Sequence, residues 1–175
     1  IYDQGARNFW VHNTDPLRCL AQNIAKFGSD PSSLDRLGCT SEHILATKHL
    51  NLQLDVLYTK FRGRYTDSNI TYVEISTIKS KLQTNCKLLS IRELFAGFEQ
   101  LIMACCDCGY GYGGPPRNYD NRISCRQTKV VNGATITAQG CSGTENVNWD
   151  GTHYSEAANQ YVSSQILTGK YYDPP

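Results

Sequence analysis

The segment NWDGTHYSEAAN, residues 148–159, marks the point at which an irregular stretch of the chain gives way to a helix. Ser155 is a typical N-cap residue, and the apolar residues after it recur at helical spacing, which predicts a helix over 155–169. Asp150 precedes His153 by three positions, close enough for its carboxylate to accept a hydrogen bond from the imidazole. In serine hydrolases such a bond fixes the tautomer of the histidine that takes the nucleophile's proton. The alternative interpretation is a surface aspartate beside a histidine that helps to cap the helix.

Towards the N-terminus, strand and helix patterns alternate. Residues 9–11, Phe-Trp-Val, form an apolar run typical of a strand buried on both faces, with Trp10 in the core. A surface loop rich in Gly, Pro, Ser and Asp covers 27–43, and apolar residues at helical spacing then predict a helix that ends at Gly63.

The same alternation continues after this helix. ITYVEI, residues 70–75, favours a second strand, and the amphipathic segment 76–85 favours a further helix. Strand, helix, strand and helix in this order predict parallel strands in a layered α/β architecture. Because no internal repeat or linker interrupts the pattern, we expect a single domain over 1–175.

Residues 104–146 differ in kind, since they are polar, glycine-rich and studded with cysteines. They predict an irregular, disulfide-rich loop region. The chain has eight cysteines: Cys19, Cys39, Cys86, Cys105, Cys106, Cys108, Cys125 and Cys141. This even number favours disulfides formed in an oxidising compartment, and the lack of a second compact cysteine pair argues against zinc. We expect Cys19 to pair with Cys39, because the two flank one loop, and Cys105 and Cys106 to pair with Cys125 and Cys141; Cys86 and Cys108 are then left for each other.

Composition narrows the class of protein further. The 175 residues carry 17 basic and 16 acidic side chains without a run of one sign, so a nucleic-acid partner is not expected. No apolar stretch is long enough for a transmembrane segment, and the first residues lack the pattern of a signal peptide, which predicts a processed or cut N-terminus. The sequon at Asn69 is a candidate glycosylation site and, with the cysteines, indicates a secreted or vacuolar protein.

Several blocks together resemble one family. GARNFWVHNTDPLRCL (5–20), ACCDCGYGYGGPPRNY (104–119), VNWDGTHYSEAANQYVSSQILTG (147–169) and the terminal DPP are similar to the plant GDSL esterase/lipases of the SGNH hydrolase superfamily. The resemblance covers essentially the whole chain. It implies a flavodoxin-like, three-layer αβα fold, of which this chain supplies the C-terminal part, and a cofactor-free hydrolase in which Asp150 and His153 are the triad acid and base.

The remaining family machinery has no counterpart in the 175 residues. The family's nucleophile lies in a Gly-Asp-Ser block, which is absent, and its oxyanion-hole Gly and Asn blocks are absent as well. Since the histidine then lacks a proton to take, we expect this chain alone to be inactive. A second polypeptide with the serine half is one expectation, and a portion of an intact enzyme is another. The complete enzyme would hydrolyse a lipid, an acetylated sugar or a phenolic ester.

An alternative from another class is a non-catalytic storage, defence or carbohydrate-binding protein built on the same scaffold. Its attraction is the missing nucleophile and the unusual cysteine loop. Two further residues are candidates for lining a site: His12, at the end of the first strand, and Trp149, beside Asp150. The competing interpretations are a structural histidine and a tryptophan that packs under the loop.

Overall fold

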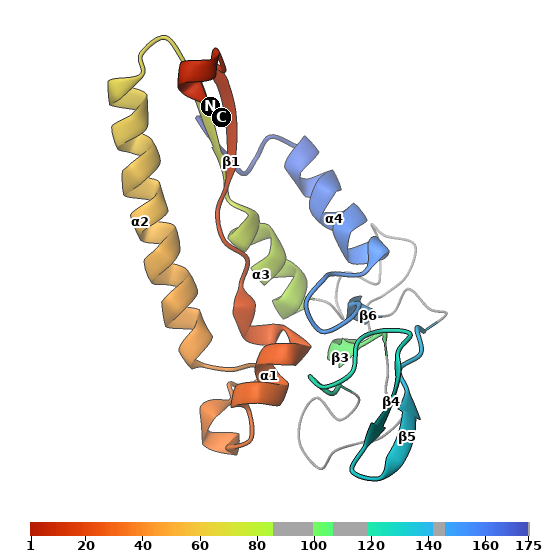
Figure 1. Ribbon diagram of the computed structural model, residues 1–175. Helices are drawn as coiled ribbons and strands as arrows, with labels where there is room; N and C mark the ends of the chain where they lie inside the picture. Colours follow the sequence, from red (N-terminus) through yellow and green to blue (C-terminus); the bar gives the residue numbers. More distant parts are fainter. Residues whose placement is uncertain (86–99, 107–118, 142–145, 175) are drawn as a thin grey trace.

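The computed structural model describes residues 1–85, 100–106, 119–141 and 146–174 (Figure 1). The helices of these segments are α1 (Ala21–Phe27), α2 (Glu42–Arg64), α3 (Ile75–Asn85) and α4 (Glu156–Leu167), with short 3-10 turns at Tyr2–Gln4, Leu17–Cys19 and Pro31–Ser33. The strands are β1 (Asn8–His12), β2 (Asn69–Val73), β3 (Gln100–Ala104), β4 (Thr128–Val131), β5 (Ala134–Thr137), β6 (Asn146–Asn148) and β7 (Tyr172–Asp173).

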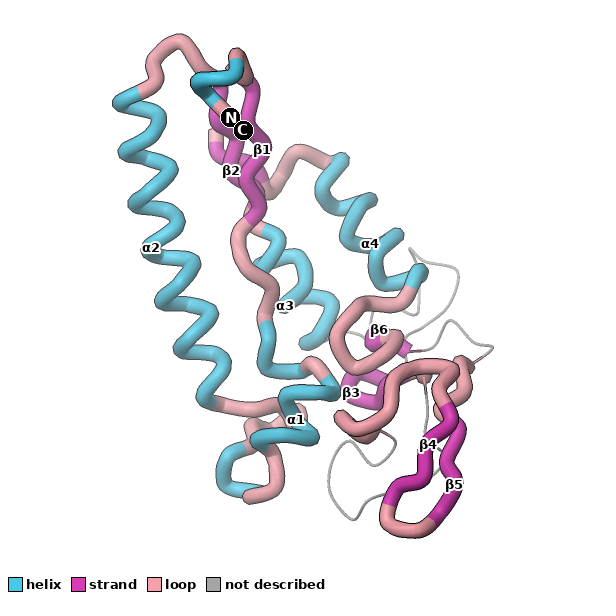
Figure 2. Tube along the Cα trace, in the orientation of Figure 1, coloured by secondary structure: helices cyan, strands magenta, loops and turns pink. Residues whose placement is uncertain are grey.

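The strands pair in the parallel manner that the alternating pattern predicts. β1 and β2 are parallel over their whole length, from Asn8 opposite Asn69 to His12 opposite Val73, and β7 adds an antiparallel edge to β2. β3 and β6 form a second parallel pair. Helices lie on both sides of the first sheet, with α2 on one side and α3 and α4 towards the other (Figures 1 and 2). The expected α/β architecture is therefore confirmed.

Helix α2 covers one face of the β1–β2 sheet. Tyr58 stacks on Tyr72 of β2, with ring centroids 4.3 Å apart, and both rings are buried with Ile70. The helix passes through the predicted stop at Gly63 and ends one residue later, at Arg64. An apolar groove of about 380 Å³ remains between α2, β1 and β2, and Phe9 and Phe61 are among the residues that line it.

The prediction of a first strand buried on both faces, with Trp10 in its core, is wrong. Exposed and half-buried residues alternate along β1, and Trp10 is 56% exposed. The reason is that α2 packs against only one face of β1, where Phe9 and Val11 are half-buried, and Trp10 lies on the opposite face. In the described part of the chain, the Trp10 ring contacts only the edges of the His12 and Tyr172 rings among aromatic side chains, 5.5 and 5.7 Å away.

The main core joins α3 and α4 to the strands. Ile78 and Leu82 of α3, Ala158 of α4 and Val147 of β6 are almost completely buried in it, together with Val73 of β2. Helix α4 begins as predicted, because the Ser155 hydroxyl accepts a hydrogen bond from the Ala158 N–H, and it ends at Leu167, shortly before Gly169. This core fixes β6 and the start of α4, the two elements that flank Asp150 and His153.

The disulfide-rich region is more regular than expected. β4 and β5 form a hairpin that the sequence analysis missed, although Asn132-Gly133 is the strongest short-range signal for one. Both turn residues have positive φ, 52° and 80°, as a type I′ turn requires. Strands β3 and β6 were missed as well. β6 has only three residues, and β3 is a short apolar run that periodicity alone cannot assign.

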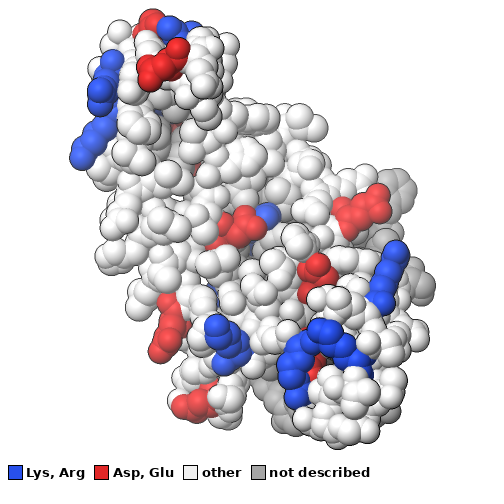
Figure 3. Space-filling view, viewed as in Figure 1, with Lys and Arg blue, Asp and Glu red and all other residues white. Residues whose placement is uncertain are grey.

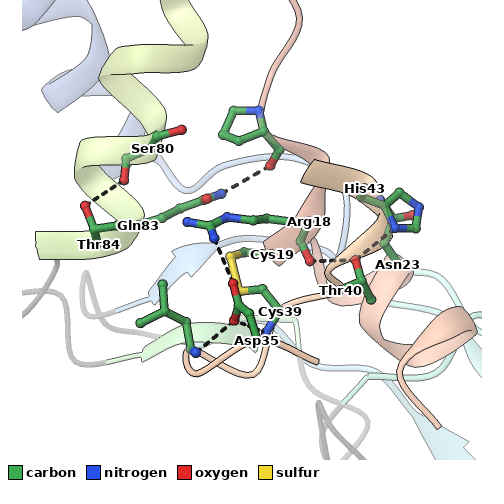
Figure 4. Close-up of a disulfide and its surroundings, with 12 residues drawn as sticks. Arg18, Cys19, Asn23, Asp35, Cys39, Thr40, His43, Ser80, Gln83 and Thr84 are labelled. Carbon is green, nitrogen blue, oxygen red and sulfur yellow. Dashed lines mark hydrogen bonds and ion pairs between the residues drawn. A yellow bond between two sulfur atoms is a disulfide. The ribbon is translucent and has the colours of Figure 1, made fainter. Parts of the chain in front are cut away.

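Three disulfides agree with the expected pairing: Cys19–Cys39, Cys105–Cys141 and Cys106–Cys125. The proposed Cys86–Cys108 pair and most of the glycine and tyrosine run at 109–119 lie outside the described residues. Around Cys19–Cys39, Arg18 forms an ion pair of 2.7 Å with Asp35, whose carboxylate also accepts hydrogen bonds from the Leu37 and Cys39 N–H groups (Figure 4). No helix of the described segments is long and apolar enough to cross a membrane.

Candidate active site

Asp150 and His153 meet as the sequence spacing predicts. The Nδ1 atom of His153 lies 2.8 Å from Oδ2 of Asp150, and the His153 main-chain N–H donates to Oδ1 of the same carboxylate, also over 2.8 Å. The Asp150 side chain is 25% exposed and the His153 side chain 74% exposed. With Nδ1–H donated to the carboxylate, Nε2 carries the free lone pair, and within the described residues no side chain or main-chain group binds it.

The environment of Asp150 favours its charged form. Partial burial alone would raise the pKa of this carboxyl, but hydrogen bonds from the His153 main chain and ring and from the Thr152 N–H outweigh burial. The pKa therefore lies below the ordinary value of 3.8. An ionised, acceptor-only carboxylate holds the imidazole in one tautomer and stabilises the imidazolium that forms when Nε2 takes a proton.

Main-chain and side-chain bonds close the loop that carries both residues. The Trp149 N–H donates to the His153 carbonyl over 2.8 Å, so the ends of the loop are tied together. Gly151, at φ 94°, donates its N–H to the Asn148 side chain, and its carbonyl accepts a hydrogen bond from the N–H of Gln22 in α1. The positive φ explains why a glycine stands between Asp150 and His153.

Beneath the loop lies a buried polar network that the sequence analysis did not find. Tyr154, which follows His153, is buried; desolvation raises the pKa of its hydroxyl above the ordinary value. Gln83, only 1% exposed, donates from Nε2 to this hydroxyl and to the Pro16 carbonyl, the latter shown in Figure 4. The Lys79 ammonium lies 4.3 Å from the centre of the Tyr154 ring. The spacing of these residues along the chain offers no signal that would have brought them together.

The two candidates for lining the site have different surroundings. Trp149 is half-buried, and its indole packs against Gly140, where an added Cβ would lie 3.2 Å from Cη2. This favours the interpretation that it packs beneath the cysteine loop. His12 is exposed at the end of β1, and the aromatic ring that it contacts is Trp10. No contact joins His12 to Asp150 or His153 within the described segments.

The remaining expectations concern modification and metals. Asn69 is exposed at the start of β2, and its side-chain amide donates to Asn8 over 2.9 Å. Six of the eight cysteines form disulfides and so are not zinc ligands. Across the described ranges, no group of three or more His, Cys, Asp or Glu side chains is arranged to hold a metal ion. On the face drawn in Figure 3, acidic and basic side chains occur together, in keeping with the even charge balance.

Fold and site together define a class: an α/β protein with a hydrogen-bonded aspartate and histidine on a loop between a parallel strand and a helix. The chain belongs to the GDSL lipase/acylhydrolase family, because the family model described as GDSL-like lipase/acylhydrolase matches residues 1–166. The expected family resemblance is thereby confirmed.

Curated plant relatives agree with this assignment. GDSL esterase/lipase At1g54790 of Arabidopsis thaliana is 50% identical, with 100% of this chain and 47% of the relative covered. GDSL esterase/lipase At3g05180 of the same plant is 49% identical over 98% of this chain and 42% of its own length. GDSL esterase/lipase ENOD8 of Medicago truncatula is 38% identical over 100% of this chain and 42% of its own length. The chain thus spans less than half the length of these relatives.

Proposed function

We propose that this chain supplies the acid and base of a secreted serine esterase that hydrolyses carboxylic esters. The observation that carries the proposal is the hydrogen bond of 2.8 Å between Asp150 and Nδ1 of His153, with Nε2 left open towards solvent. Nε2 takes the proton of a serine hydroxyl as that oxygen attacks the ester carbonyl, and then gives it to the departing alcohol. A water molecule then attacks the acyl-enzyme, with Nε2 again taking the proton, and the carboxylic acid product is released.

The nucleophilic serine comes from outside these 175 residues, in the same polypeptide or in a second one. Support comes from the sequence, which contains no Gly-Asp-Ser, and from the relatives, which are more than twice as long. The exposed Trp10 on edge strand β1 and the apolar groove beside α2 are surfaces that a further part of the fold would cover. By itself, this chain is expected to be inactive.

The substrate class is proposed from the family alone: an ester of a lipid, an acetylated sugar or a phenolic acid. The three disulfides support folding in the secretory pathway, with the extracellular space or the vacuole as the destination. The rival proposal, a non-catalytic storage, defence or carbohydrate-binding protein, finds support in the missing Gly-Asp-Ser block and the unusual cysteine loop.

Native material is the sample for the test. Its intact mass, measured before and after denaturation under reducing conditions, tells whether the serine lies on the same chain or on a companion. A fluorophosphonate probe should label that serine, and p-nitrophenyl acetate should be hydrolysed. His153→Ala should reduce hydrolysis by about 10³-fold or more, whereas His49→Ala, an exposed histidine on α2, should leave it unchanged. Absence of both labelling and hydrolysis in the native protein would favour the non-catalytic alternative.

A further inference from the structure

Two residues from disulfide-closed loops, Tyr119 and Gly140, pack against the segment that carries Asp150 and His153. Tyr119 lies between Cys106 and Cys125, within the loop that their disulfide closes. Its ring lies directly on the main chain of Gly151: a Cβ added to this glycine would come within 2.1 Å of Cε2 and 2.3 Å of Cζ of Tyr119. Approaches below 3.0 Å do not occur for real Cβ atoms, so the ring occupies the space that any other residue at 151 would need.

The contact falls at a critical place. Gly151 directly follows Asp150 and stands two residues before His153. Its φ of 94° sets the turn that brings the two side chains together. Asn148 holds its N–H and Gln22 holds its carbonyl through hydrogen bonds of 2.8 and 3.1 Å. The Tyr119 ring packs against the Cα atom of the same residue, where a side chain would otherwise lie.

The second loop, closed by Cys105–Cys141, contains Gly140, on which the Trp149 indole packs. The main chain of two neighbouring cysteines is also hydrogen-bonded to this segment. The N–H of Cys105 donates to the Asn148 carbonyl, and that of Cys106 donates to the Trp149 carbonyl. Each loop therefore begins at a cysteine whose main-chain N–H is hydrogen-bonded to one of the two residues before Asp150.

We propose that Tyr119 is a positioning residue: its ring, packed against Gly151, fixes the main chain there and thereby the geometry of Asp150 and His153. The inference rests on the proposed function, since it concerns the rate of the same ester hydrolysis. A displaced loop moves Nε2 away from the serine hydroxyl, and misplacement of a catalytic group by about 1 Å lowers the rate about 10²-fold. Substrate binding is affected much less, because Tyr119 acts through Asp150 and His153.

The test uses the native protein with p-nitrophenyl acetate. Tyr119→Ala should lower kcat at least tenfold while KM changes less than threefold, and Tyr119→Phe, which keeps the ring, should retain at least half of kcat. Thermal unfolding and a peptide map of Cys106–Cys125 show that each variant is folded. Equal kcat for the folded Ala variant and the wild type would overturn the proposal, as would a Phe variant as slow as Ala.

Gly151 provides an independent test. Gly151→Ala should reduce kcat at least as far as Tyr119→Ala, but the double variant should be no slower than Gly151→Ala alone, because the clash has been removed. Gly133→Ala is the matched control: its φ is 80° and nothing lies within 4 Å, so it should lower the melting temperature and leave kcat within twofold. Effects that multiply fully in the double variant would reject the contact.

These measurements distinguish failure of the positioning role from failure of the proposed function. If the wild type hydrolyses the ester and His153→Ala abolishes turnover while Tyr119→Ala does not lower kcat, only the positioning role is wrong. If the native protein neither hydrolyses esters nor reacts with the fluorophosphonate, the proposed function fails, and the positioning role fails with it.

Discussion

The main-chain N–H of Cys106 donates a hydrogen bond of 2.6 Å to the carbonyl of Trp149, the residue that precedes Asp150. With the neighbouring bond from Cys105 to Asn148, it extends the pairing of β3 with β6 beyond the end of both strands. The disulfide-rich region and the Asp150–His153 loop are therefore continuous in hydrogen bonding. A change at Cys105 or Cys106 is expected to reach the site through these main-chain bonds.

Asp150→Asn should lower the rate of ester hydrolysis by about 10⁴-fold in the active protein, because an amide no longer fixes the tautomer with Nε2 as the base.

The same substitution should change the pH dependence of stability. The folded-state pKa of Asp150 is depressed, so the stability it contributes is present above its unfolded pKa of about 3.9 and is lost as pH falls through the folded value. The wild type should therefore lose its stability advantage over the variant below about pH 4. Thermal melts between pH 2.5 and 7 measure this, with Asp3→Asn, an exposed carboxylate, as the control.

Removal of Cys19–Cys39 should reduce the free energy of unfolding by about 3 kcal/mol, because the bond closes a loop with a sequence separation of 20. The measurement is urea denaturation of the Cys19→Ser/Cys39→Ser variant. Cys39 is fully buried, so Cys39→Ala in place of serine separates the cost of a buried hydroxyl from that of the lost cross-link. A loss below about 1 kcal/mol for both variants would contradict the prediction.

Asp173 joins the end of the chain to α2. The Tyr58 hydroxyl and the Arg62 guanidinium donate to its carboxylate and hold its pKa below 3.8. Asp173→Asn should lower the free energy of unfolding by about 1 kcal/mol at pH 7, since the pair is partly exposed. The difference should vanish as pH falls through the folded pKa of Asp173, where the wild-type carboxylate is protonated. A difference that is constant from pH 7 to pH 2.5 would refute the assignment.

Gln83 and Tyr154 should be energetically coupled. Gln83→Leu leaves the buried Tyr154 hydroxyl and the Pro16 carbonyl without their donor, at a cost of about 1–3 kcal/mol in the free energy of unfolding. In a Tyr154→Phe background the same substitution should cost about 1 kcal/mol less. Urea titrations of the four proteins give the coupling energy, and additive effects would show that the hydrogen bond is unimportant.

The sequence by itself determined the local features. The Ser155 cap, helix α4 and the bond between Asp150 and His153 depend on groups within a few residues of one another, whose geometry the main chain dictates. The parallel pairing of β1 and β2 also followed from the alternation of strand and helix. The hairpin at Asn132-Gly133 belongs to the same local class, and its signal was present although it was overlooked.

Only the tertiary structure decided what surrounds these elements. Tyr119 reaches Gly151, Gln22 binds the same glycine and Gln83 reaches Tyr154 across separations that carry no periodic signal in the chain. The exposure of Trp10 likewise depends on which face of β1 is covered by α2, not on its apolar neighbours in sequence. Asp150 and His153 are thus brought together within three consecutive peptide units, whereas the contacts that hold them in place arise from long-range packing, which no local sequence pattern predicts.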